Sequence, residues 1–182
     1  VRMGAGQIRP VSRLTFFDSI ETISNRLRQA RTKVMSQAIQ SPRFLHGELR
    51  VVVIAGWAGG TGSGAFIDLG ALVKKTYGDE ISLEGVFVMP GVYRDVDDAY
   101  AKLAANGFAA LRETNHYLTH RFKTQWDENT KCDVDSLYER YTLFSGINAQ
   151  SREIHEDKDA YYAIGEMLYI DFAGGPMKGW IE

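Results

Sequence analysis

The 182-residue chain (20.4 kDa) is 45% hydrophobic and 24% charged, which is typical of one globular domain and excludes a disordered or fibrous protein. Its net charge of −2 argues against a nucleic-acid-binding protein. The longest apolar run, residues 51–55, is far shorter than the roughly 20 residues of a membrane-spanning helix, so we expect no membrane segment. The single cysteine, Cys132, has no disulfide partner, and we expect an ordinary thiol in a cytoplasmic protein.

The first half of the chain alternates between helix and strand patterns. Residues 49–55 form a β-branched run typical of a strand buried on both faces of a parallel sheet, and residues 83–89 repeat that pattern. Residues 65–75 read as a helix with lysines in the last turn. Residues 11–40 are predicted as one helix, because apolar residues recur at helical spacing and form one stripe. That stripe comprises Leu14, Phe17, Ile20, Ile23, Leu27 and Val34.

The second half continues the alternation. Residues 95–118 are predicted as a long helix, residues 119–138 as a loop or short helix, and residues 141–147 as a weaker third strand. Residues 159–172 are predicted as a final helix. The inward residues expected in the first of these helices are Leu103, Phe108, Leu111 and Leu118, and Tyr161, Ile164, Leu168 and Phe172 share one face of the last. This order predicts an α/β layered domain with a parallel sheet.

The strongest functional signal is a glycine-rich loop between the first predicted strand and the helix that follows it. Five glycines fall within residues 56–64, more than a tight turn requires. Glycines let backbone N–H groups converge on an anion, and the next helix presents a partial positive charge at its N-terminus. Thr61 and Ser63 add hydroxyl donors. The loop therefore predicts a phosphate-binding site at the carboxyl end of a strand.

Two common phosphate loops do not match this segment. A Walker loop needs a lysine directly after the glycines, but no lysine follows them until Lys74. The dinucleotide fingerprint G-x-G-x-x-G fails on spacing, because Gly60, Gly62 and Gly64 alternate. The second strand also ends in Met89-Pro90, where a ribose-binding acid is expected. A Rossmann-type NAD-dependent oxidoreductase therefore stays only as a weaker alternative.

Residues 59–64, with the sequence GGTGSG after a buried strand, closely resemble the signature loop of the tubulin and bacterial cell-division GTPase superfamily. Three further segments resemble parts of that fold: residues 4–10 its preceding phosphate loop, residues 86–90 its next strand and residues 104–111 its following helix. Asp159-Ala160-Tyr161 resembles the start of its central helix. Ala58 replaces the first of the family's three glycines. The nearest subgroup is the divergent bacterial tubulin-like proteins.

The resemblance implies a Rossmann-like, parallel-sheet α/β nucleotide-binding domain that holds GTP or GDP, with Mg²⁺ accompanying GTP. The α- and β-phosphates would lie on Gly59, Gly60, Thr61, Gly62, Ser63 and Gly64. Gly4, Ala5 and Gly6 would approach the γ-phosphate. It also implies longitudinal self-association into oligomers or filaments of a cytoskeletal kind.

The base and ribose contacts implied by the resemblance are less sharply defined. Tyr161 would stack on the base, although it also reads as a core aromatic of an amphipathic helix. Asn148 would hydrogen-bond the base or is a plain loop residue. A ribose-contacting acid falls near Asp95, although Asp97 and Asp98 fit as well, and this acidic stretch also reads as a helix N-terminus. The family's guanine-reading acid falls at Gly165, with Glu166 roughly 100° around the helix.

Both ends of the chain suggest a partial domain. It begins at Val1 and stops at Glu182 after a helix-like run, so residues 1–182 are expected to be the middle of the domain, truncated at both ends. The family's first strand and catalytic acidic loop would lie outside, so no catalytic residue is assigned. Hydrolysis would be completed between subunits. A non-hydrolysing tubulin-fold scaffold is the main alternative. His116 and His120 stand four residues apart, as a metal pair or a solvent-facing pair.

Overall fold

The computed structural model describes residues 5–40, 49–78, 81–94, 100–147, 153–154 and 157–173. Gly4, Asp95 and Asn148 lie outside the described residues. The α-helices are α1 (Arg9–Asp18), α2 (Ile20–Gln40), α3 (Gly60–Tyr77), α4 (Tyr100–Tyr117) and α5 (Asp157–Ala173), and a 3-10 helix, η2, spans Pro90–Tyr93. The strands are β1 (Leu49–Gly56), β2 (Ile81–Val88), β3 (Phe122–Gln125), β4 (Lys131–Val134) and β5 (Arg140–Phe144).

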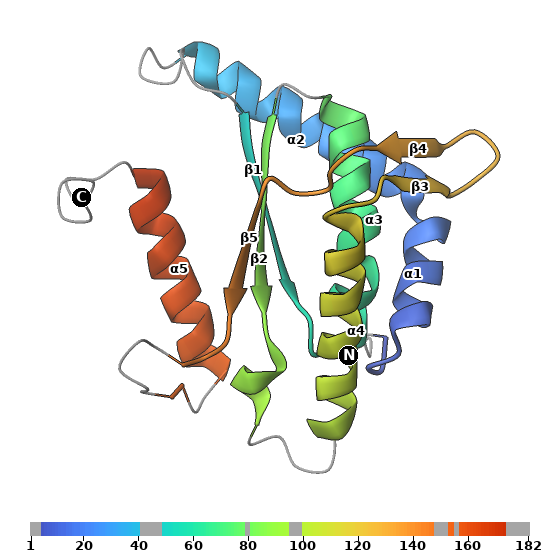
Figure 1. Cartoon of the computed structure of the whole chain (residues 1–182). Coiled ribbons are helices and arrows are strands. Elements are labelled where there is room, and N and C mark those ends of the chain that lie inside the picture. Colours follow the sequence, from blue (N-terminus) through green and yellow to red (C-terminus); the bar gives the residue numbers. More distant parts are fainter. Residues whose placement is uncertain are drawn as a thin grey trace.

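The main sheet has three parallel strands in the order β1-β2-β5, and their arrows point the same way in Figure 1. The register aligns Gly56 of β1 with Val88 of β2, and Val88 with Phe144 of β5. All three carboxyl ends therefore reach one edge of the sheet, where α/β folds bind ligands. The predicted α/β domain with a parallel sheet is confirmed.

The two faces of the sheet are covered by different helices. On one face, Leu83 and Phe87 belong to the larger core with residues of α3, and Phe87 stacks on Trp57 with ring centroids 4.6 Å apart. On the other face, Val86 and Val88 pack with Ile164 of α5. Figure 1 shows α5 on its own side of the sheet, opposite α3 and α4. The side chains of β2 alternate between these layers, as expected for a strand buried on both faces.

The predicted helix over residues 11–40 is two helices, interrupted at Ser19. Phe16 and Ile20 are buried on either side of the break, whereas Leu14, counted in the predicted stripe, is 71% exposed. One continuous stripe was therefore the wrong prediction. The interruption lets side chains of both helices reach the core.

The inward face of α4 also differs from the prediction. Leu103 is buried, but Phe108 is 63% and Leu118 60% exposed. Apart from Leu103, the buried residues are small: Gly107, Ala110 and Thr114. A Cβ on Gly107 would lie 2.3 Å from Pro90 Cγ, so this helix packs by close approach rather than by large apolar side chains.

The segment predicted as a loop or short helix, residues 119–138, contains the antiparallel hairpin β3–β4. Four-residue strands are too short to show a clear alternation, so the sequence did not reveal them. The hairpin packs on α3, where the Trp126 indole N–H donates to Asp68 Oδ1 at 2.7 Å. Cys132 is buried there, and burial raises the pKa of its thiol, consistent with an ordinary thiol.

Ion pairs connect α5 to the strands of the main sheet. Arg50 of β1 donates to both carboxylate oxygens of Glu84 at 2.8 Å and also pairs with Asp171 of α5. Arg140 of β5 contacts both carboxylates. These arginines lower the pKa values of Glu84 and Asp171. The network holds the carboxyl-terminal end of α5 against the sheet.

Candidate functional site

A cavity of about 500 Å³ lies at the carboxyl edge of the sheet. This volume is within the usual range for small-ligand sites. Its walls come from segments far apart in the chain: the start of the described region, the glycine loop, η2 and α4. The lining residues are Ala5, Gly6, Gln7, Gly56, Ala58, Gly59, Gly60, Thr61, Gly62, Tyr93 and Leu103. Six of the predicted phosphate-site residues therefore share one cavity, namely Ala5, Gly6, Gly59, Gly60, Thr61 and Gly62.

The N-terminus of α3 opens onto this cavity. Gly59 is the N-cap residue, with an extended backbone and no side-chain hydrogen bond to cap the helix. The first N–H groups of any α-helix lack partners within the helix and carry a partial positive charge. A Cβ built on Gly59 would meet no atom within 4 Å. The loop therefore offers backbone donors beside open space, which suits an anionic group.

The other glycines of the loop are needed for close packing. A Cβ on Gly60 would lie 2.5 Å from Ile8 N, and one on Gly62 would lie 2.4 Å from the Gly56 carbonyl oxygen. A Cβ on Gly64 would lie 2.4 Å from the first carbonyl oxygen of α1. Each glycine thus lets α3 approach a different segment, a reason for the excess of glycine that the sequence alone did not show.

The two loop hydroxyls have different surroundings. Thr61 lines the cavity, and its Oγ1 accepts a hydrogen bond from Ala5 N at 3.4 Å. Ser63 is fully buried and donates to the Gly59 carbonyl oxygen one turn earlier in the helix. Only Thr61 therefore has its hydroxyl at the cavity wall, whereas the hydroxyl of Ser63 stabilises the first turn of α3.

The wall opposite the glycine loop is a tight turn formed by residues 5–8. Gly6 and Gln7 both have positive φ, +57° and +63°, and Ile8 N donates to the Ala5 carbonyl oxygen at 2.9 Å. Glycine accepts this left-handed conformation readily, whereas glutamine adopts it at a cost. The turn brings residues 5–7, among them the predicted site residues Ala5 and Gly6, to the cavity.

Two residues at the cavity, Tyr93 and Asn106, were not singled out from the sequence, and Leu103 was predicted only as an inward residue of its helix. Tyr93 and Leu103 line it, from η2 and α4 respectively. Asn106 of α4 uses its amide nitrogen to donate to the carbonyl oxygens of Gln7 and Ala58, each at 3.0 Å. Asn106 lies within the segment 104–111 that resembles the family's helix, but nothing in its spacing distinguishes a bridging asparagine from a surface one.

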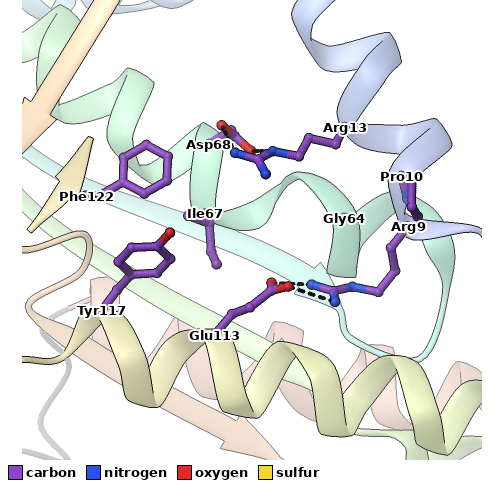
Figure 2. Close-up of a pocket in the computed structure, with 9 residues that line it drawn as sticks. All are labelled: Arg9, Pro10, Arg13, Gly64, Ile67, Asp68, Glu113, Tyr117 and Phe122. Atoms are coloured by element: carbon purple, nitrogen blue, oxygen red, sulfur yellow. Dashed lines mark hydrogen bonds and ion pairs between the residues drawn. The ribbon is translucent and has the colours of Figure 1, made fainter. Parts of the chain in front are cut away.

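Arginines on α1 hold this helix, and with it the turn 5–8, against α3 and α4. Arg9 donates to the Ser63 carbonyl oxygen at 2.8 and 3.0 Å and forms an ion pair with Glu113 of α4. Arg13 pairs with the buried carboxylate of Asp68 at 2.9 Å. Figure 2 shows the two pairs on either side of a smaller cavity of about 310 Å³, with the side chain of Ile67 between them.

The predicted base-binding residues lie on α5, beyond Tyr93. The hydroxyl of Tyr161 is 3.3 Å from that of Tyr93, so Tyr161 reaches the cavity only through this neighbour. Tyr161 is 53% exposed, which contradicts its alternative reading as a core aromatic. Together with Glu166 and Gly165 it lines a separate cavity of about 490 Å³ on α5. The structure therefore does not bring Glu166 to the glycine-loop cavity.

The rings of the two predicted histidines stack on each other. The rings of His116 and His120 are 4.2 Å apart and nearly parallel, at an exposed position near the end of α4. Among the described residues, no group of three His, Cys, Asp or Glu side chains is arranged to hold a metal ion. Nor does any described helix have the length and apolar character required to cross a membrane.

The family model described as tubulin-like matches residues 1–179, nearly the whole chain. The chain belongs to the tubulin-like family. No curated protein and no solved structure matches it significantly. The resemblance carried by the glycine loop is thus confirmed, and the three-stranded parallel sheet is consistent with a Rossmann-like tubulin domain. In this tubulin-like chain the glycine loop of residues 59–64 lies at the carboxyl edge of the sheet, as the strand and helix patterns predicted.

Proposed function

We propose that this tubulin-like chain binds a guanine nucleotide, GTP or GDP, in the cavity at the carboxyl edge of its sheet. The observation that carries the proposal is the uncapped N-terminus of α3, which opens beside Gly59 onto a cavity of about 500 Å³. A helix N-terminus with a glycine loop favours phosphate through backbone donors and the helix dipole. Family membership supports the same ligand.

The phosphates would be held by backbone N–H groups of Gly59 to Gly62 with the Thr61 hydroxyl. Residues 4–6 would approach the terminal phosphate from the opposite wall. Tyr93 and Tyr161 would contact the nucleoside end. Among the described residues, no carboxylate lines this cavity, so a Mg²⁺ ion bound with GTP would rely on the phosphate oxygens for its anionic ligands. The bound nucleotide would supply the negative charge that the backbone donors of both walls contact.

Nucleotide-dependent self-association is the second part of the proposal. A tubulin-like protein would assemble through longitudinal contacts, with hydrolysis completed by a residue of the neighbouring subunit. Sedimentation of the full-length protein with GTP and with GDP tests this part. A larger pelleted fraction with GTP supports assembly, and equal fractions with either nucleotide and without any nucleotide contradict it.

A non-hydrolysing scaffold is the alternative, and one observation favours it. The family's guanine-reading acid falls at Gly165, and no atom lies within 4 Å of a Cβ built there. This position therefore supplies no carboxylate, and no neighbouring side chain fills the space where one would lie. Nucleotide that copurifies with the full-length protein but is turned over no faster than in buffer would favour the scaffold.

Titration with fluorescent GTP, with ATP and NAD as competitors, tests nucleotide binding directly. The blocking variant is Gly59→Val, because this residue lines the cavity with an extended backbone that valine adopts without strain. Ala30→Val, which adds bulk at an exposed position of α2 outside the cavity, serves as the control. We expect Gly59→Val to abolish binding at an unchanged melting temperature. Unaltered affinity of this variant for GTP would refute the loop assignment. A melting temperature raised by NAD but not by GTP would favour an oxidoreductase.

A further inference from the structure

Asn106 lies outside the two loops of the proposed nucleotide cavity and hydrogen-bonds both of them. Its Nδ2 donates to the carbonyl oxygen of Gln7 and to that of Ala58, each at 3.0 Å. Those carbonyls belong to opposite walls, the turn 5–8 and the glycine loop. Because both partners are acceptors, the amide must present its nitrogen to them, which determines the orientation of the side chain.

The two walls meet through backbone contacts, without large side chains between them. Gly60 packs directly on the backbone of Gln7 and Ile8. Gln7 has a positive φ, outside any regular helix or strand pattern that would pair its carbonyl. An asparagine amide has two N–H groups and can satisfy two acceptors at once. Asn106 therefore ties the two walls together from outside, in addition to the direct hydrogen bond from Ala5 N to Thr61 Oγ1.

The helix that carries Asn106 is itself held in place. The next residue, Gly107, packs on Pro90 of η2 so closely that a Cβ would lie 2.3 Å from Pro90 Cγ. Two turns further along, Glu113 pairs with Arg9 of α1. The helix α4 is thus tied to the segment after β2 and to the helix after the turn 5–8. These contacts let Asn106 act as a fixed reference for both loops.

We propose that Asn106 is a positioning residue that sets the separation of the two phosphate-binding loops. The inference rests on the proposed nucleotide binding and deepens it. Asn106 touches neither phosphate nor base in this assignment; it acts through the backbone of Gln7 and Ala58. Loss of its amide donors leaves both loops folded but no longer held at the spacing that lets N–H groups from the two walls meet one ligand.

The test replaces Asn106 by aspartate, which keeps the shape but puts an oxygen against two carbonyl oxygens. We expect Asn106→Asp in the full chain to bind fluorescent GTP about tenfold more weakly, the change that about 1.4 kcal/mol produces. Asn115→Asp makes the same change at an exposed position of α4 and is the control. Asn106→Ala removes the donors without a charge, in case the aspartate variant does not fold.

Amide hydrogen exchange without nucleotide separates positioning from general destabilisation. Faster exchange at residues 5–8 and 57–60 together, with β2 unchanged, supports the inference, because a global loss of stability raises exchange in the central strand as well. Unchanged exchange at both loops, or unchanged GTP affinity in Asn106→Ala, overturns it. If the unaltered protein binds no nucleotide, the proposed function fails, and the exchange experiment alone then decides the role of Asn106.

Discussion

Replacing Gly62 by alanine tests whether close packing, rather than ligand binding alone, requires glycine in the signature loop. Gly62 lies in the first turn of α3, against the last residue of β1. A Cβ there would be 2.4 Å from the Gly56 carbonyl oxygen and 2.9 Å from its nitrogen. Real Cβ contacts are essentially never below 3.0 Å. Because the neighbouring atoms are backbone, they cannot rotate away as a side chain would.

The expected cost follows from the displacement. The first turn of α3 must move by about 1 Å to restore an ordinary contact of 3.4 Å. Overpacking of this kind costs about 1–3 kcal/mol. Alanine regains up to about 1 kcal/mol, because glycine is the poorer helix former. We therefore expect the free energy of unfolding to fall by about 1–2 kcal/mol, which for a chain of this length lowers the melting temperature by about 3–6 °C.

Gly59→Ala is the matched control, since a Cβ there meets nothing within 4 Å and the backbone is extended. The loss of a good N-cap residue and the reduced entropy of the unfolded chain oppose each other, so its stability should stay within about 0.5 kcal/mol of the original. Calorimetry of both variants without nucleotide makes the comparison. Gly62→Ala at or above the original stability, or equal losses in the two variants, would refute the packing argument.

Three further changes test other parts of the structure. Glu84→Gln should lower the free energy of unfolding by about 2 kcal/mol at pH 7, because the carboxylate accepts hydrogen bonds from two arginines. The pKa of Glu84 is lowered from its usual 4.5, so the carboxylate stabilises the fold above pH 4.5 and this contribution is lost as the pH falls through the lowered pKa. In urea unfolding, the difference in stability between the variant and the original protein should therefore be smaller at acidic pH than at neutral pH. Asp68→Leu should cost about 3 kcal/mol, because the buried Trp126 N–H loses its acceptor and Arg13 its partner, and a melt of unchanged midpoint would contradict this. Gly165→Ala should raise stability by about 0.5–1 kcal/mol, since this exposed mid-helix position has open space around it; lower stability in thermal unfolding would mean that the site is packed.

Much of the site was predictable because it depends on contiguous sequence. The glycine loop, its preceding strand and its following helix form one short segment, and their order alone places the loop at the carboxyl edge of a parallel sheet. Asn106 and Tyr93 were not predicted, because their roles come from contacts with residues far away in the chain. The inward face of α4 was missed for a related reason: its small residues pack by close approach, which hydrophobic periodicity does not register.

The sequence by itself determined the layered α/β class, the glycine-rich loop of residues 59–64 between a strand and a helix, and the resemblance to the tubulin-like family. These properties follow from local patterns: β-branched runs, helical spacing and glycine content. Only the tertiary structure decided which of these glycines close packing requires. Gly60, Gly62 and Gly64 each contact a different segment, whereas Gly59 opens onto free space. The reason is physical: whether a position requires glycine depends on which atom an added Cβ would contact, and that atom usually belongs to a distant part of the chain.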